Sequence, residues 1–401
     1  MAQLTPRAHP RGVVPPPPMA VAAATDVIVE PVRSAADRDR FITFQHDLYR
    51  KDRYYVAPIV AERRDFLDSR KNPFLAHAEI ELYLARRHGE VVGRIAAIND
   101  PNWNQFHNTE NGFFGMFDCI DDAGVAAALF DAAAAWVKAK GFPQMMGPVN
   151  LSTNHDCGLL IEGFDYPPAM MMPYNFRYYA ALYEAAGFEK AKDLWSYELS
   201  TSIAPPEKVI RVAEKLRHDE GVLVRPLNLK DLPEEIRRLK NIYNAMLDRT
   251  WGFVPMSEEE FDLIANRLRP LVQIRPELCF IAEVKGDPVA FSLTLPDSNI
   301  AIKAADGHLT RYGLPVGLMK MAWAARSIDR LRVLLFGIKP GYRRRGLDAL
   351  LYLDTLRAAR DLGYTGGELG WTTEDNDLMN RAIESMGARR YKTYRLYERA
   401  V

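Results

Sequence analysis

A cluster of arginines lies where the chain passes from a predicted strand into a predicted helix. The strand is the apolar run at residues 331–338, which ends at a Lys-Pro-Gly turn. The loop and helix start that follow carry Tyr342, Arg343, Arg344, Arg345, Gly346, Leu347, Asp348 and Ala349. A helix start offers unpaired backbone N–H groups and the positive end of a dipole, so this corner suits a diphosphate. The alternative is a solvated charge run before an ordinary helix.

A second group of reactive side chains occupies residues 154–175. Titratable, amide and apolar residues are crowded there in a predicted long loop, and long loops in compact domains are often functional. His155 and Asp156 are candidates for acid–base work, although neighbours in sequence need not point the same way. Met170, Met171 and Met172 could line an apolar channel, or they could belong to the core.

Length and composition limit the class of protein. A chain of 401 residues is too long for one ordinary core, so two domains are expected. Lysine plus arginine equals aspartate plus glutamate at 52 each, which leaves no overall charge to attract nucleic acid. Three cysteines and eight histidines show neither a disulfide framework nor metal-ligand spacing, which favours a cytoplasmic protein without a metal. No apolar run approaches the ~20 residues of a membrane-spanning helix.

Matching residues recur along the chain at two spacings. Pairs 222 residues apart are followed by pairs 200 apart: Gly141 and Gly363, Asn154 and Asn376, Gly187 and Gly387, and Tyr197 and Tyr397. Several matches in the same order indicate a duplication. We therefore predict a disordered, proline-rich tail at residues 1–26 and two similar domains at 27–200 and 201–401. The fall in spacing indicates about 22 extra residues in the first domain, which we assign to an acceptor-side insert at 155–176.

The arginine loop resembles the phosphate loop of the GNAT superfamily of acyl-CoA-dependent N-acyltransferases. That loop reads Arg or Gln, two residues, Gly, one residue, then Gly or Ala. Arg343 and Gly346 match it, Asp348 stands where the small residue is usual, and the first domain has only a degenerate loop. Residues 183–188 resemble the superfamily's Tyr-Glu-x-x-Gly-Phe ending, and Ile383 replaces the tyrosine in the second domain. The resemblance implies an α/β fold of two tandem GNAT-like domains, each a mixed, mostly antiparallel twisted sheet flanked by helices.

By the same resemblance, the second domain binds acyl-CoA, and no metal takes part. The residues implied in acyl-CoA binding are Phe336, Gly337, Ile338, Arg343, Arg344, Arg345, Gly346, Leu347, Asp348, Ala349 and Asn376. The strand at 336–338 would splay from its neighbour and offer an N–H group to the thioester oxygen. Asn376 would bond the pantetheine arm, or the stretch 374–376 would instead cap the following helix.

The implied reaction needs a neutral amine and a route for the leaving thiolate. The candidate bases are His155, Asp156, Glu374 and Asp375. Ile383 cannot donate a proton, so Tyr174 is the first candidate for the acid, unless the thiolate leaves without one. The residues expected to meet the acceptor, in a pocket between the two halves, are Asn154, Glu162, Met171 and Asn175.

The Gly147-Pro148 step ahead of Asn154, and residues 172–175 after it, resemble the YghO-type branch of the superfamily. That branch is similar to the bacterial ceramide synthases, which implies transfer of a long-chain acyl group to the amine of a sphingoid base. The alternatives are acetylation of another small amine, an aminoacyl-tRNA-dependent transferase, and a non-catalytic CoA-binding module. The expected partners are acyl-CoA and an amine acceptor, without nucleic acid. A lipidic acceptor and a peripheral contact with the inner membrane are further options.

Overall fold

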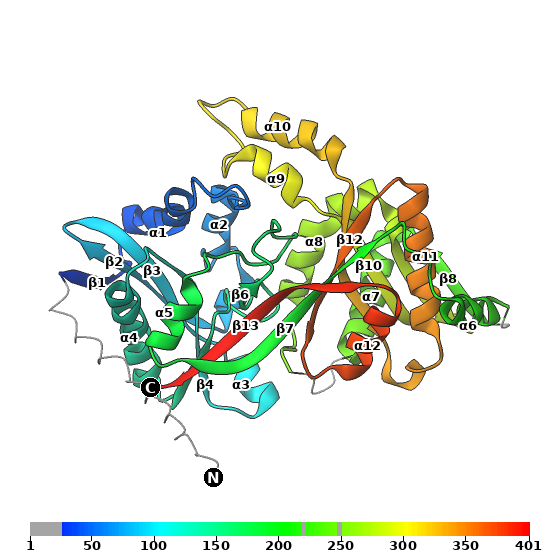
Figure 1. Cartoon of the computed structure of the whole chain (residues 1–401), viewed down its shortest axis with the longest axis horizontal. Coiled ribbons are helices and arrows are strands. Elements are labelled where there is room, and N and C mark those ends of the chain that lie inside the picture. The colour runs from blue at the N-terminus through cyan, green and yellow to red at the C-terminus, as the bar shows by residue number, and fades with distance from the viewer. Residues whose placement is uncertain (1–25, 219–220, 247–250) are drawn as a thin grey trace, which may run out of the picture.

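The computed structural model describes residues 26–218, 221–246 and 251–401. The predicted proline-rich tail therefore lies almost entirely outside the described residues. Figure 1 shows two lobes side by side, with strands β7 (Glu189–Ser200) and β13 (Arg389–Ala400) running across both. None of the helices within the described ranges has the length and apolar character needed to span a bilayer.

Each half of the chain supplies strands and helices in a similar order. The first half contains β1 (Val27–Pro31), α1 (Ala35–Leu48), α2 (Val60–Phe66), β2 (Glu79–Arg87), β3 (Glu90–Asn99), α3 (Pro101–His107), β4 (Asn111–Cys119), α4 (Ala123–Ala139), β5 (Gln144–Gly147), β6 (Leu159–Glu162), α5 (Tyr179–Ala185) and β7. The second half contains α6 (Glu207–Arg217), β8 (Val222–Pro226), α7 (Leu232–Met246), α8 (Glu258–Ile274), β9 (Cys279–Val284), β10 (Asp287–Pro296), α9 (Asn299–Ala305), α10 (Val316–Ala324), β11 (Arg330–Ile338), α11 (Leu347–Asp361), β12 (Gly366–Thr373), α12 (Asp377–Ser385) and β13.

The strands of the described residues form one sheet. Its order is β1-β2-β3-β4-β5-β13-β7-β12-β11-β10-β9-β8, and β6 also pairs with β13. Neighbours are antiparallel except β4 with β5 and β11 with β12, which are parallel. The predicted α/β fold with mixed, mostly antiparallel pairing is therefore confirmed.

The two halves exchange their last strands. β7, which ends the first half, pairs with β12 of the second half, while β13 pairs with β5 and β6 of the first half. β7 and β13 also pair with each other. Tyr394 and Tyr397 of β13 are buried among first-half side chains, so the first half's core includes residues from the end of the chain. The boundary at residue 200 stays a prediction.

Both faces of the sheet are covered by helices, because the central strands are apolar on both sides. On β3, Ile95 and Ala97 pack with α4 and α5, whereas Ala96 and Ile98 pack with α1 and α2. In the second half, α7 and α8 cover one face and α6 and α11 cover the other. A catalytic group can therefore reach the sheet only where two strands separate or where a helix leaves a cavity.

Candidate active site

β11 and β12 separate part-way along their length. They pair only over residues 330–333 and 366–369. β12 then follows β7, whereas β11 continues to Ile338 beside β10, and a bulge interrupts the β10–β11 pairing at the same level. One edge of β11 beyond Val333 therefore faces a gap instead of a strand. The predicted residues along this edge are Phe336, Gly337 and Ile338.

The corresponding gap in the first half is closed by the chain itself. β4 and β5 pair over three residues and then separate. The Val149 N–H donates to the carbonyl oxygen of Phe114 (2.8 Å), and Asn150 Oδ1 accepts from the N–H of Met116 (2.8 Å). A Cβ atom at Gly115 would lie 1.7 Å from the carbonyl oxygen of Val149, so this closure requires glycine.

The predicted phosphate loop leads from β11 into α11. Gly346 is the N-cap of the helix and has the left-handed backbone (φ 87°) that glycine favours. The N–H groups of Leu347, Asp348 and Ala349 donate to no acceptor among the described residues. The first N–H groups of a helix have no acceptor within the helix, so these three can donate to a ligand. On its other side the loop contacts α6, since a Cβ at Gly346 would lie 2.5 Å from Val212 Cγ1.

The three arginines of this loop are exposed. Arg343 Nε lies 3.4 Å from the carbonyl oxygen of Ile338, the end of β11. Arg344 has a left-handed backbone (φ 62°), and the guanidinium of Arg345 lies 5.0 Å from the centre of the Tyr342 ring. The loop thus presents positive charge next to unpaired N–H groups, an arrangement that can hold an anion.

A cavity of about 280 Å³ lies beneath the inserted segment. Its wall includes residues of α1, α2 and the loop between them, of β3, the end of β4, the insert and α5, together with Asn299 and Ile302 of α9 from the second half. The predicted residues of the insert in this wall are Asp156, Met170, Met171, Met172, Tyr174 and Asn175. Within the described ranges, no three His, Cys, Asp or Glu side chains lie close enough together to hold a metal ion.

Asp156 and His155 have different surroundings. Asp156 lines the cavity, and burial raises the pKa of its carboxyl group while the charge of Arg63 opposes that shift. The His155 ring packs edge-on against Phe66, with 5.1 Å between centroids, and its Nδ1 lies 3.1 Å from Ser152 Oγ. Burial lowers the pKa of His155 to about 4, and its ring is not part of the wall. Asp156 is therefore the better placed of the two to take a proton from a ligand in the cavity.

Tyr174 and Asn175 line the cavity but already have partners. The Tyr174 hydroxyl donates to Asp52 Oδ2 (2.8 Å), and burial raises the pKa of Tyr174, so this hydroxyl keeps its proton. The Asn175 side chain accepts from the N–H of Leu160 (2.7 Å) and donates to its carbonyl oxygen (3.1 Å). These are the hydrogen bonds that the backbone of a neighbouring strand would otherwise make. Asn175 shapes the wall, whereas Tyr174 also offers a protonated oxygen.

Two residues predicted to meet the acceptor are absent from the cavity wall. The Asn154 side chain donates to the carbonyl oxygen of Val254 (3.1 Å) and so ties the insert to the second half. Glu162 is exposed on β6 and accepts a hydrogen bond from Thr393 Oγ1 of β13 (2.5 Å). Asn154 thus connects the insert to the second half, and Glu162 connects β6 to β13. The roles of both residues in acceptor binding stay predictions.

The stretch after β12, residues 374–376, forms ion pairs with lysines of β7 and caps α12. Glu374 Oε2 pairs with Lys190 Nζ (2.6 Å), and Asp375 pairs with Lys192 Nζ (2.8 Å). Asn376 is the N-cap of α12, where its Oδ1 accepts from the N–H of Met379 (3.3 Å). Of the two accounts that the sequence left open, helix capping is present at Asn376.

Two wall residues had no signal in the sequence. Tyr55 Oη and Arg63 Nε are buried with no hydrogen-bond partner among the described residues. The Arg63 guanidinium lies over the Phe66 ring (4.4 Å), and no carboxylate within the described ranges forms an ion pair with it. Buried donors without acceptors are costly, so both favour a ligand that carries oxygen atoms. In the sequence Arg63 stands among other charged residues and resembles a surface position.

One contact joins the gap to the cavity. Arg332 lies on β11 just before the strands separate, and it forms a buried ion pair with Glu368 of β12. Arg332 Nη2 also contacts the sulfur of Met172 (3.0 Å) in the cavity wall. The cavity therefore adjoins the place where β11 leaves its neighbour.

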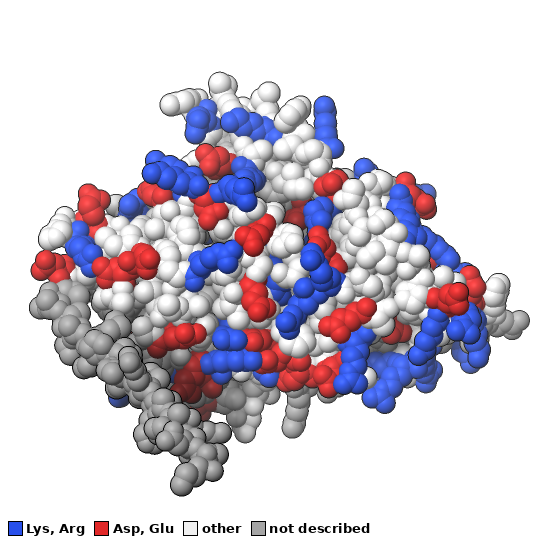
Figure 2. Space-filling view, viewed as in Figure 1, with Lys and Arg blue, Asp and Glu red and all other residues white. Residues whose placement is uncertain are grey.

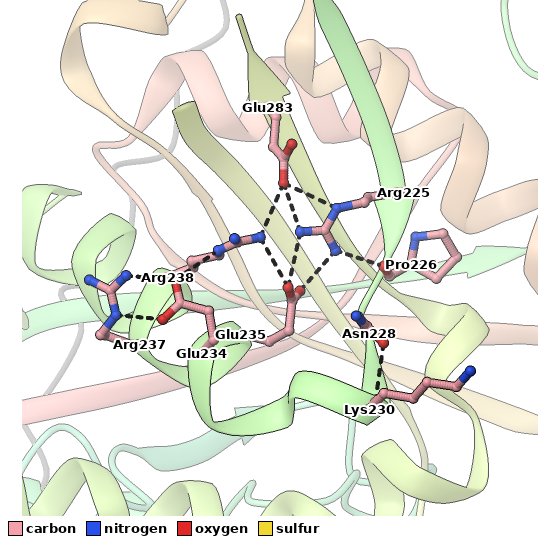
Figure 3. A network of polar contacts seen from close by, with 9 residues as sticks. All are labelled: Arg225, Pro226, Asn228, Lys230, Glu234, Glu235, Arg237, Arg238 and Glu283. Carbon is pink, nitrogen blue, oxygen red and sulfur yellow. Dashed lines mark hydrogen bonds and ion pairs between the residues drawn. The ribbon is translucent and has the colours of Figure 1, made fainter. Parts of the chain in front are cut away.

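A second, smaller cavity of about 70 Å³ lies between α7, α8 and the β10–β11 pair. Its apolar lining includes Leu227, Leu232, Ile236, Leu239, Ile264, Ala265, Leu268, Val272, Phe291, Leu293 and Leu335. Leu335 lies on the part of β11 that borders the gap. α7 is held in place by ion pairs of Arg225 with Glu235 (3.0 Å) and Glu283 (2.7 Å), which connect it to β8 and β9 (Figure 3).

Two curated proteins match almost the whole chain. Protein YghO of Escherichia coli (strain K12) is 36% identical over 374 residues, which cover 91% of this chain and 93% of YghO. The bacterial ceramide synthase of Caulobacter vibrioides is 34% identical over 383 residues, 94% of this chain and 98% of that protein. The chain belongs to their family. No model of a known protein family matches it.

Solved structures confirm the fold of this YghO family member. A tandem GNAT protein from the clavulanic acid biosynthesis pathway matches with a TM-score of 0.53 at 12% identity, over 93% of this chain and 98% of that one. A GCN5-related N-acetyltransferase from Sphaerobacter thermophilus matches with a TM-score of 0.51 at 14% identity, over 94% and 97%. Family and fold together make the protein an acyltransferase of the GNAT type, as predicted.

Proposed function

We propose that this protein transfers a long-chain acyl group from acyl-CoA to the amine of a sphingoid base. The first support is the relative named bacterial ceramide synthase, which matches 94% of this chain. The observation that carries the proposal is the contact of Arg332 with Met172. This contact supports the proposal, because a thioester held in the gap and an amine held in the cavity would then lie close together.

The second half would bind acyl-CoA. The N–H groups at the start of α11 and the dipole of that helix would hold the diphosphate, with the loop arginines beside it. The pantetheine arm would lie along the free edge of β11, where an N–H group of residues 336–338 would donate to the thioester oxygen. The acyl chain would enter the small apolar cavity, where each buried methylene contributes about 0.8 kcal/mol.

The first half would bind the acceptor. Its ammonium group would lie near Asp156, and its hydroxyl groups would accept hydrogen bonds from Tyr55 and Arg63. The apolar chain would pack against the methionines of the insert, which adapt to irregular shapes. An amino alcohol is favoured over a simple amine, because a simple amine would leave both buried donors unpaired.

In the proposed reaction Asp156 removes a proton from the ammonium, and the neutral amine attacks the thioester carbonyl carbon. A C–N bond forms, and the developing oxyanion is stabilised by the N–H of β11. The C–S bond then breaks, and CoA leaves as a thiolate. The nitrogen loses its second proton to give the amide, and the thiolate takes up one proton, either from water or from the Tyr174 hydroxyl, which the proton released from nitrogen then restores. Both substrates are bound together, without a covalent enzyme intermediate.

The full chain, a saturated long-chain acyl-CoA and sphinganine test the proposal by mass spectrometry of the lipid products. We expect the N-acylated amide, and its loss when Asp156→Asn replaces the wild type. Product only from acetyl-CoA and a small amine, or only with charged tRNA, would support a different transferase. CoA binding without any product would support a non-catalytic module.

A further inference from the structure

The helical hairpin of α9 and α10 projects from the second half (Figure 1). It lies between β10 and β11, where the first half has only the short helix α3 between β3 and β4. α10 packs closely on the turn after α9, since a Cβ at Gly317 would lie 1.7 Å from the carbonyl oxygen of His308. The outer side of α10 is left without a covering element among the described residues.

This outer side is apolar. Eleven large hydrophobic side chains of the described residues are exposed, and five of them lie here: Tyr312 (97%), Leu314 (63%), Leu318 (53%), Met319 (67%) and Trp323 (76%). On α10, Leu318, Met319 and Trp323 lie within one arc of the helix at 3.6 residues per turn. We call these five residues the hairpin face. Clustered apolar side chains on a protruding element mark an interaction surface.

The hairpin is also positively charged. Residues 299–327 contain Lys303, Arg311, Lys320 and Arg326 against a single carboxylate, Asp306. In Figure 2 the protruding top of the molecule is mostly white, with blue lysine and arginine atoms around it. Apolar residues with Trp and Tyr, flanked by cations, are typical of helices that lie in the interface of an anionic bilayer.

The hairpin adjoins the acceptor cavity. Asn299 and Ile302 of α9 form part of the cavity wall, and the Asn299 side chain donates to the carbonyl oxygen of Pro168 in the insert (2.8 Å). A surface that rests on the hairpin face would therefore lie close to the place where a lipid acceptor enters. This link between docking and catalysis rests on the proposed function.

We propose that the hairpin face docks this protein on an anionic lipid bilayer and brings the acceptor cavity to the membrane surface. A second copy of the chain fits less well, because a symmetric contact would bring the cations of two hairpins together. An anionic bilayer instead complements those cations and accepts the apolar side chains.

Flotation of the full chain with vesicles, in the absence of substrates, tests the docking. We expect binding to phosphatidylglycerol vesicles that weakens at high salt, and little binding to phosphatidylcholine vesicles. Met319→Glu/Trp323→Glu should bind at least ten-fold more weakly, and Lys320→Glu/Arg326→Glu should lose the preference for anionic lipid. The matched control Ile28→Glu/Leu378→Glu changes equally exposed apolar residues elsewhere and should bind like the wild type.

Two results would overturn the docking proposal. One is equal vesicle binding by the Met319→Glu/Trp323→Glu variant and the wild type, or no binding by either. The other is light scattering that shows a wild-type dimer lost in that variant, with vesicle binding unchanged. Vesicle binding without amide product would instead remove the proposed function and leave the docking intact.

Discussion

Asp156 and Arg63 lie in the same cavity wall, and the charge of each changes the pKa of the other. Burial raises the pKa of Asp156, whereas the neighbouring guanidinium stabilises the carboxylate and limits that rise. A carboxyl group with a raised pKa is a stronger base than an exposed aspartate and is suited to accept a proton from an ammonium. Its neighbour His155 is packed against Phe66 and is absent from the cavity wall, so we predict a smaller part for it in catalysis.

Replacing Asp156 by Asn should lower kcat by about 100-fold or more, since a positioned base contributes roughly 10²–10⁴. The amide keeps the volume of the side chain, and unchanged acyl-CoA affinity by calorimetry would show that the fold is intact. His155→Gln is the matched neighbouring change and should keep kcat within several-fold of the wild type. Equal losses in the two variants would contradict the assignment of the base.

His155 should instead affect stability at acid pH. Its pKa is about 4 in the folded chain and 6.5 without the protein environment, so the unfolded chain binds more protons between these values. The His155 contribution therefore destabilises the fold as pH falls from 6.5 towards 4. The stability deficit of His155→Gln should shrink by about 1–2 kcal/mol from pH 7 to pH 5, measured by urea denaturation. A deficit that stays constant would refute this account.

At the scale of elements, β11 has two neighbours for part of its length and one beyond Val333. The same strand borders both the gap and, through Leu335, the small apolar cavity. Under the proposed function, an acyl chain held at the gap would extend past Leu335 between α7, α8 and the sheet. The residues at the far side of that cavity would then set the length of the acyl chain that fits.

A bulky side chain inside the small cavity should shorten the preferred acyl chain. Ala265→Trp fills the wall on α8 and should move the kcat/KM optimum to shorter acyl-CoA, with a loss of about ten-fold or more for the longest chains. Competition between acyl-CoA lengths, read by mass spectrometry, measures the shift. Ala245→Trp, an exposed position on α7, is the control. An unchanged length profile would place the acyl chain elsewhere.

The sequence predicted the elements whose pattern is local. The apolar strand at residues 331–338 and the helix that starts after the arginine loop are both present in the structure. Pairing between distant strands could not be predicted, because the ends of β7 and β13 share the same Tyr-Glu step and either could complete either half. Tyr55 and Arg63 were missed for a similar reason, since an unpaired donor is defined by the shape of the folded cavity.

At the scale of the whole molecule, the exchanged strands should make the two halves unfold together. Tyr397 of β13 is buried in the first-half cluster beside Tyr183, so Tyr397→Ala should cost about 3–5 kcal/mol. Calorimetry should show one transition at lower temperature, and hydrogen exchange should show lost protection in β2–β4 and in β11–β12 alike. Leu378→Ala, an exposed change, is the control. Two separate transitions would show that the halves are independent.

The exchange also affects how the protein is made. When the first half leaves the ribosome, the edge of β5 is still unpaired, because its partner β13 is synthesised last. During that time β7 can occupy the vacant place and must later give way, and an open strand edge also invites pairing with another chain. Two nascent copies could each contribute their final strand to the other, and the result would be a domain-swapped dimer.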